Sequence, residues 1–229
     1  MSLPVFGLKK YQRDCLKALR EYLEKTVELN DADTAFYART GRAYTPPPAL
    51  PKLPYVCLRV PTGGGKTILA AHSIAVAADS FLRTDTPLVL WLVPSQTIRD
   101  QTLATLTDRA NPNRRALAER FGENVRIMGV ADALYAKRAD YDGGAVVIVA
   151  TIQAFRVEET EGRKVYAANG ELMDHFSALP EVLRATLEAG PDGEPVRSLA
   201  NVLRLHRPMV MVDEAHNCLV PAFHGSGLG

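Results

Sequence analysis

The sequence predicts an α/β fold in which helices flank a doubly wound parallel sheet. Four short apolar runs, each followed by a polar cluster, alternate along the chain with stretches of helical periodicity. The runs lack the in-and-out alternation of half-exposed strands, which is typical of parallel strands covered on both faces. They comprise residues 56–60, 88–93, 146–150 and 209–212. Strands that alternate with helices favour a parallel sheet with helices on both sides.

An amphipathic helix is predicted first, over residues 8–29. Its apolar residues recur at intervals of three and four, and Lys17 with Glu21 and Arg20 with Glu24 are spaced for ion pairs one turn apart. Periodicity predicts further helices at residues 67–82, 96–109, 113–121 and 171–189, the last with a break near Pro180.

Proline and glycine indicate how the chain is organised. Residues 46–54 hold five of the 15 prolines, a density that neither a helix nor a central strand tolerates. Residues 156–193, rich in Glu and interrupted by glycines, are expected to be a solvated insertion between strands. We therefore expect an N-terminal helix at 1–29, a Pro-rich insertion or linker at 30–54, the main domain at 55–217 and a Gly-rich tail at 218–229.

The composition excludes several classes of protein. Lys plus Arg number 27 and Asp plus Glu 26, so nucleic acid or anionic lipid could be bound only through local groups. The apolar runs fall far below the roughly 20 residues that a membrane helix needs, and the N-terminus lacks the apolar region of a secretory signal. We expect no membrane contact and a cytoplasmic location. The three cysteines lie far apart and are expected to be reduced and structural.

Residues 61–67, PTGGGKT, predict a phosphate-binding loop between a strand and a helix. Glycines let backbone N–H groups turn toward phosphate oxygens, and a helix N-terminus adds partial positive charge. Lys66 supplies a full charge, and the Thr67 hydroxyl can bind Mg²⁺. Val60 stands where the usual pattern has its first glycine, so a flexible turn is the alternative. The candidate nucleotide-binding residues are Thr62, Gly63, Gly64, Gly65, Lys66 and Thr67.

Two adjacent acids, Asp213 and Glu214, follow the apolar run at 209–212. Strand ends of an open α/β sheet meet at the ligand crevice, so Asp213 could bind the metal on a nucleotide, directly or through water. Glu214 could then polarise the attacking water. The alternative is that the two acids simply end a strand in solvent. This alternative is less favoured because Lys66 and Thr67 supply the other half of a magnesium–nucleotide site.

These motifs resemble the superfamily 2 DEAD/DEAH-box helicases, and among them the ATPases related to the type III restriction enzyme helicase subunit. Residues 61–67 are similar to motif I in the form that this superfamily uses without the first glycine, and residues 213–216 spell DEAH, motif II. The resemblance implies a RecA-like P-loop domain that binds ATP and Mg²⁺. It implies catalytic roles for Lys66, Asp213 and Glu214 and a coupling role for His216.

Three shorter segments extend the resemblance. Residues 8–12, LKKYQ, are similar to a segment whose glutamine reads the adenine edge, which implies that Gln12 binds the base; a surface glutamine is the alternative. Residues 93–96 resemble motif Ia and residues 150–153 the T-x-Q segment, both of which touch a nucleic-acid backbone. The residues implied are Pro94, Ser95, Gln96, Thr151 and Gln153. Helix capping by the serine and the threonine is the alternative.

The resemblance covers about residues 8–217, and the sequence departs from the family's pattern after that. It holds no S/T-A-T segment of motif III, no second RecA-like domain and no nuclease domain. We therefore expect a fragment whose first domain is incomplete, with a gap in the sheet beside the motif II strand. An arginine finger of the second domain is worth about 10³ to 10⁵ in rate, so slow hydrolysis is expected unless a second domain, or a modification or other partner subunit, is supplied.

The leading interpretation is the ATP-binding and ATP-hydrolysing motor half of a helicase or translocase that acts on nucleic acid, DNA in the first instance. The alternative is a residual nucleotide-binding or partner-docking module without catalysis, which an added C-terminal half would not stimulate. A P-loop kinase for a small molecule is disfavoured, because such an enzyme does not call for the DEAH run, Gln12 or the T-x-Q segment.

Overall fold

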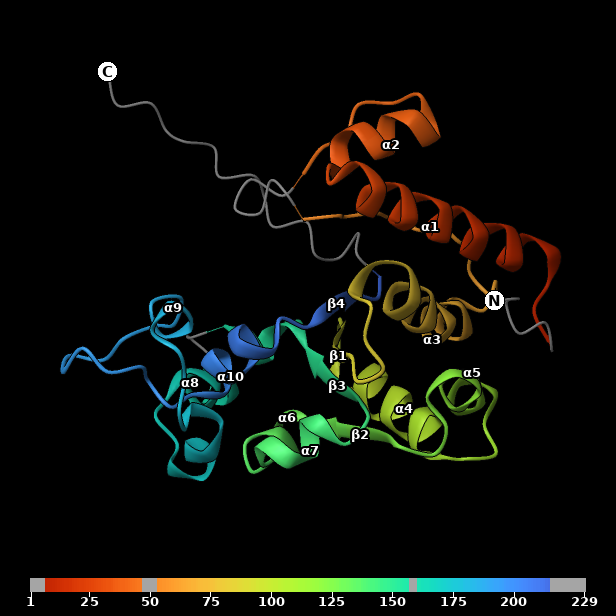
Figure 1. Ribbon diagram of the computed structural model, residues 1–229. Coiled ribbons are helices and arrows are strands. Elements are labelled where there is room, and N and C mark those ends of the chain that lie inside the picture. The colour runs from red at the N-terminus through yellow and green to blue at the C-terminus, as the bar shows by residue number, and fades with distance from the viewer. Residues whose placement is uncertain (1–6, 47–52, 157–159, 215–229) are drawn as a thin grey trace, which may run out of the picture. The chain divides into compact units, whose positions relative to one another are not determined.

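The structure, a computed structural model, describes residues 7–46, 53–156 and 160–214. The chain divides into two compact units, one of residues 1–87 and 108–125 and one of residues 88–107 and 126–229. Figure 1 labels the elements of both units. None of the described helices is both long enough and apolar enough to cross a membrane.

The first unit is built from helices. Helix α1 (Lys10–Leu29) contacts α2 (Ala32–Thr40) and α3 (Lys66–Ala77), and α3 contacts α5 (Pro112–Phe121). A π-helical turn, η1 (Ala78–Leu82), continues α3. These helices confirm the predictions for residues 8–29, 67–82 and 113–121.

Helix α1 has the amphipathic character that its sequence predicts. Its buried side is lined by Gln12, Leu16, Leu19, Tyr22, Leu23 and Thr26. The two expected ion pairs form on its other side, with Nζ of Lys17 3.7 Å from Glu21 and Nη1 of Arg20 3.9 Å from Glu24. Burial of the apolar stripe, rather than these surface pairs, supplies most of the stability of such a helix.

Helix α2 occupies the first part of the segment 30–54. The Asp31 carboxylate caps it by accepting a hydrogen bond from the Asp33 N–H at 3.0 Å, and the helix ends at Gly41 in the left-handed conformation. Phe36 of α2 meets Tyr22 of α1 edge to face, with ring centroids 5.9 Å apart. The segment therefore begins with a helix that packs on α1.

Residues 56–60 do not form the predicted strand. The structure assigns them no strand, and their exposure alternates between half-buried and exposed instead of being buried throughout. An extended segment becomes part of a sheet only when a neighbouring strand exchanges backbone hydrogen bonds with it. Among the described residues, no strand pairs with this segment. The apolar composition predicted an extended segment, but composition does not indicate whether a neighbouring strand will pair with it.

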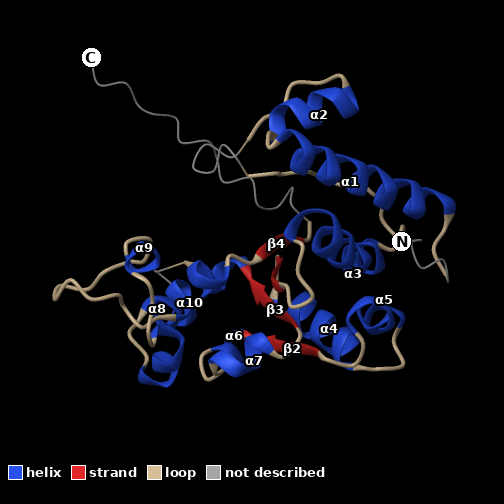
Figure 2. Cartoon of the chain, viewed as in Figure 1, coloured by secondary structure: helices blue, strands red, loops and turns tan. Residues whose placement is uncertain are grey.

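The second unit contains a four-stranded parallel sheet, which confirms the predicted fold class. Figure 2 shows its strands in red. The strand order is β2-β3-β1-β4, and β1 pairs in parallel with both β3 and β4. The strands are β1 (Leu88–Val93), β2 (Val125–Gly129), β3 (Ala145–Thr151) and β4 (Met209–Val212). Three apolar runs thus form strands as predicted, and β2 is an additional one.

Short helices follow and connect these strands. They are α4 (Gln96–Thr107), α6 (Val130–Ala133), α7 (Arg138–Asp142), η2 (Ile152–Phe155), α8 (Thr160–Tyr166), η3 (Gly170–Phe176), α9 (Glu181–Arg184) and α10 (Leu199–His206). Helix α4 confirms the prediction for residues 96–109. The helix predicted over residues 171–189 is instead the 3₁₀ turn η3 and the short α9, separated by Ala178 in the left-handed conformation and by Pro180.

One face of the sheet forms the core of the second unit. Leu88 and Leu90 of β1 lie on the same face as Val146 and Ile148 of β3, with which they are in register. The same cluster includes the fully buried Val165, Leu172, Leu199 and Val202. Because two of these lie within residues 156–193, the expectation of a merely solvated insertion there is wrong.

Candidate functional site: a phosphate loop and a strand-end group

Residues 61–67 form a tight loop that leads into α3 in the first unit. The Gly64 N–H donates to the Pro61 carbonyl at 2.9 Å, and α3 begins at Lys66. Gly63 and Gly65 have φ of +75° and +72°, a region that side chains disfavour. Gly64 is required for another reason: a Cβ there would lie 2.6 Å from Val60 Cγ1 and 2.8 Å from the Pro61 carbonyl oxygen. The conformation of the loop therefore favours glycine at each of these three positions.

Helix α1 holds the loop through Gly64. The Tyr11 hydroxyl donates to the Gly64 carbonyl at 2.6 Å, and Nε2 of Gln12 donates to the same oxygen at 2.9 Å. Oε1 of Gln12 accepts a hydrogen bond from the Lys9 N–H at 2.8 Å. Both ends of the buried Gln12 amide thus have partners within the chain, so reading adenine would require Gln12 to exchange them.

The start of α3 suits an anion. Its first turn carries no acidic residue, and its N-terminal N–H groups point toward the loop. Lys66 and Thr67 occupy the first two positions of the helix, and both are half-buried. Thr62 and Gly63 are exposed. Backbone donors, a helix N-terminus and a lysine together are the usual chemistry of a phosphate-binding site.

Asp213 and Glu214 directly follow β4 in the second unit, and both are half-buried. The Asp213 N–H donates to the Leu92 carbonyl at 2.8 Å, which continues the pairing of β4 with β1. Glu214 has a φ of +52°, and its N–H donates to Oδ1 of Asp213 at 2.9 Å. A non-glycine residue in this region costs about 1–3 kcal/mol and is often found at functional sites. His216 lies outside the described residues.

The segments that resemble motif Ia and the T-x-Q segment come together at the ends of neighbouring strands. Val93 and Thr151 end β1 and β3 and face each other in register. Nε2 of Gln153 donates to the Pro94 carbonyl at 3.4 Å, which links the two loops. Gln96 begins α4. The predicted backbone-contact residues therefore lie at the carboxyl ends of β1 and β3 or directly after them.

The hydroxyls of these loops cap helices. Oγ of Ser95 accepts a hydrogen bond from the Ile98 N–H at 3.3 Å, and Oγ1 of Thr151 accepts one from the Ala154 N–H at 3.3 Å. Capping was the alternative interpretation of both residues. A hydroxyl that accepts from a helix can still donate its own hydrogen, so contacts with a nucleic-acid backbone remain a prediction.

The metal ligands predicted from the sequence are both oxygen donors, the Thr67 hydroxyl and the Asp213 carboxylate. Among the residues that the structure describes, no three His, Cys, Asp or Glu side chains form a metal-binding group. Cys15 and Cys57 are free thiols, and Cys57 is exposed. Mg²⁺ usually takes only one or two protein oxygens and fills its remaining positions with water and phosphate. Thr67 belongs to the first unit and Asp213 to the second, and that they bind one Mg²⁺ stays a prediction.

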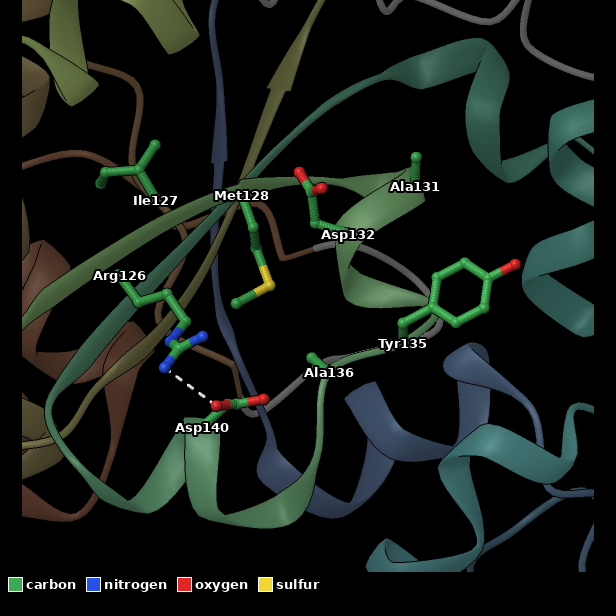
Figure 3. Close-up of a pocket in the computed structure, with 8 residues that line it drawn as sticks. All are labelled: Arg126, Ile127, Met128, Ala131, Asp132, Tyr135, Ala136 and Asp140. Carbon is green, nitrogen blue, oxygen red and sulfur yellow. Dashed lines mark ion pairs between the residues drawn. The ribbon is translucent and has the colours of Figure 1, made fainter.

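A cavity of about 580 Å³ in the second unit was not predicted from the sequence. Figure 3 shows the ion pair between Arg126 and Asp140, at 2.9 Å, on one side of it and Tyr135 on the other. Asp132 also lines it. Two carboxylates against one guanidinium do not favour phosphate there. Its residues share no motif spacing, so no signal in the sequence marks this cavity.

The chain matches a known protein family over most of its length. A family described as "Type III restriction enzyme, res subunit" matches residues 6–223, a range that includes residues 61–67 and 213–216. No curated protein matches the chain, and no solved structure does. Since the match covers nearly the whole chain, it confirms the resemblance that the motifs indicated. The chain belongs to the family of the res subunit of type III restriction enzymes.

Proposed function

We propose that this chain is the ATP-binding and ATP-hydrolysing motor half of a helicase or translocase that acts on nucleic acid, DNA in the first instance. Membership of the family implies a helicase-type ATPase domain. The observation that carries the proposal is the loop at residues 61–67. Its left-handed glycines, its anchoring by α1 and its position at the start of α3 all support a phosphate-binding role.

The proposed roles follow from the chemistry of each side chain. Backbone N–H groups of the loop and Lys66 bind the phosphates, and Thr67 and Asp213 hold Mg²⁺, the latter directly or through water. When bound, Mg²⁺ neutralises negative charge on the phosphates. Glu214 orients and polarises the attacking water. Gln12 reads the adenine edge after giving up its bond to Gly64.

The proposed nucleic-acid contacts use neutral groups. Ser95, Thr151 and Gln153 present hydroxyl and amide donors at the ends of β1 and β3. Such groups position a phosphate backbone without reading its base sequence. Each phosphate that a cation neutralises adds to the salt dependence of binding, so contacts made by neutral groups should depend only weakly on salt. His216 is proposed to couple hydrolysis to movement along the strand.

The test separates binding from hydrolysis with two variants. Lys66→Ala removes the charge that faces the phosphates, so Mg·ATP affinity should fall by at least about tenfold, the worth of a charge-assisted hydrogen bond. Glu214→Gln should keep that affinity and lower phosphate release, in the presence of single-stranded DNA, by about a hundredfold or more. Lys10→Ala, which removes an exposed charge on α1 that pairs with Asp14, is the control.

Titration calorimetry and release of labelled phosphate measure the two effects. Equal loss of ATP binding in Lys66→Ala and Glu214→Gln would contradict the assigned roles. ATP binding by the wild-type chain with no phosphate release, even when single-stranded DNA and a C-terminal half with a second RecA-like domain are added, would support the alternative of a nucleotide-binding or partner-docking module.

A further inference from the structure

We propose that Tyr11 is a positioning residue that fixes the orientation of the peptide between Gly64 and Gly65 in the phosphate loop. The inference rests on the proposed function, because it assigns a residue outside the glycine-rich motif to the same phosphate site. Tyr11 and its neighbour Gln12 in α1 both hydrogen-bond to this loop.

Two donors converge on a single backbone oxygen. The Tyr11 hydroxyl lies 2.6 Å and Nε2 of Gln12 lies 2.9 Å from the Gly64 carbonyl oxygen. A carbonyl oxygen has two lone pairs, and these two donors use both. Gly64 itself is buried, and its N–H is engaged with Pro61 at 2.9 Å. The oxygen is therefore held from the side of α1, while the preceding amide is held within the loop.

Holding this oxygen sets the direction of the next N–H group. The Gly64 carbonyl and the Gly65 N–H belong to one planar trans peptide, in which C=O and N–H point in opposite directions. A carbonyl fixed toward α1 therefore turns the Gly65 N–H away from α1. Rotation of the same peptide would put a carbonyl oxygen where a phosphate needs a donor.

Tyr11 and Gln12 differ in their other contacts and in their proposed roles. The Gln12 amide is also bound to the Lys9 N–H, and its Nε2 would lie 2.7 Å from a Cβ on Gly65. If Gln12 turns its amide to a base, as proposed, it releases the Gly64 oxygen. The Tyr11 hydroxyl then remains as the donor from α1 that keeps the peptide in place. Tyr11 would serve the phosphates of any nucleotide, whereas Gln12 would serve adenine.

The affinity test compares two ligands, Mg·ATP and inorganic Mg·tripolyphosphate, which has no base. Tyr11→Phe keeps the ring and removes only the hydroxyl, and it should weaken both ligands by the same factor of about three to ten, the usual worth of one neutral hydrogen bond. Gln12→Ala should in addition reduce the preference for ATP over GTP. Tyr37→Phe removes an exposed hydroxyl on α2 and should change neither affinity.

A ligand-free measurement tests the contact itself. Hydrogen bonds to a carbonyl shift its ¹³C resonance, so Tyr11→Phe should move the Gly64 ¹³C′ signal and the Gly65 amide signal, and Tyr37→Phe should move neither. Unchanged Gly64 and Gly65 signals in Tyr11→Phe, or equal affinities of this variant and wild type for both ligands, would overturn the inference.

The two proposals can fail separately. Absence of saturable Mg·ATP binding by the wild-type chain would contradict the proposed function, and the Gly64 signal would still decide whether Tyr11 holds the loop. Normal ATP binding by wild type together with normal binding by Tyr11→Phe would leave the proposed function intact and overturn only the role of Tyr11.

Discussion

Substitution of each loop glycine by alanine should have a different cost, because the three positions need glycine for different reasons. Gly63 has a positive φ and open space around it, whereas Gly64 has an ordinary φ and no room for a Cβ. Gly65 has both constraints, since a Cβ there would meet Nε2 of Gln12 at 2.7 Å. Gly41 follows α2 in the left-handed conformation, with a φ of +66° and open space around it, so it is a matched control outside the loop.

The magnitudes follow from these environments. A left-handed alanine costs about 1–2 kcal/mol, from which about 0.4–1 kcal/mol is recovered because alanine restricts the unfolded chain. Gly63→Ala and Gly41→Ala should therefore each destabilise the protein by about 1 kcal/mol. Gly64→Ala should cost about 1–3 kcal/mol by overpacking, since the Pro61 oxygen is backbone and cannot move aside alone. Gly65→Ala carries the left-handed cost and also displaces the Gln12 amide from the Gly64 carbonyl, a hydrogen bond worth about 1 kcal/mol, so a loss of about 2 kcal/mol is expected.

Urea unfolding measures these stabilities, and calorimetry measures Mg·ATP affinity in the same variants. Gly64→Ala and Gly65→Ala should lose ATP binding, because both displace the peptide that Tyr11 and Gln12 hold. Gly41→Ala should bind ATP as wild type does. If Gly64→Ala were as stable as wild type and bound ATP equally well, the steric reasoning and the described loop would both be refuted.

Two further predictions concern the rest of the fold. Arg120 of α5 donates to Asp79 at 2.7 Å, and both side chains are largely buried. A double-mutant cycle with alanine at both positions should therefore give a coupling energy of about 1 kcal/mol in thermal melts. A coupling energy of zero would contradict the contact. The pKa of His206 is lowered from its ordinary value of 6.5, chiefly by burial and then by the nearby His175. The unfolded chain therefore binds more protons than the folded protein at acidic pH, and the free energy of unfolding should fall as the pH drops from about 7 to 5. His206→Gln should reduce this fall in the urea midpoint, and an unchanged fall would contradict it.

Strands whose ends are marked by polar residues or proline could be predicted from the sequence. β1 and β4 occupy the predicted residues, because each is an apolar run closed by a polar or proline-containing segment. β2 was missed because its run, VRIMG, contains an exposed arginine and shows no long apolar stretch. Residues 56–60 were assigned a strand that the structure does not show, since composition says nothing about which strand would pair with them.

Part of the candidate site could likewise be predicted from the sequence, and part could not. The loop at residues 61–67 is a local motif, so its sequence predicted both its place and its need for glycine. The contacts of Tyr11 and Gln12 with Gly64 join residues more than 50 positions apart along the chain, and no spacing rule reports them. The position of Tyr11 next to Gln12 was the one available signal.

The measurement that tests the central claim most directly is calorimetric titration of the purified chain with ATP, in Mg²⁺ and again in excess chelator, for wild type and Lys66→Ala. We predict saturable, Mg²⁺-dependent binding by wild type and a loss of at least about tenfold in the variant. Equal binding by the two chains, or no saturable binding by a wild-type chain that melts cooperatively, would contradict the assignment of residues 61–67 as a nucleotide site.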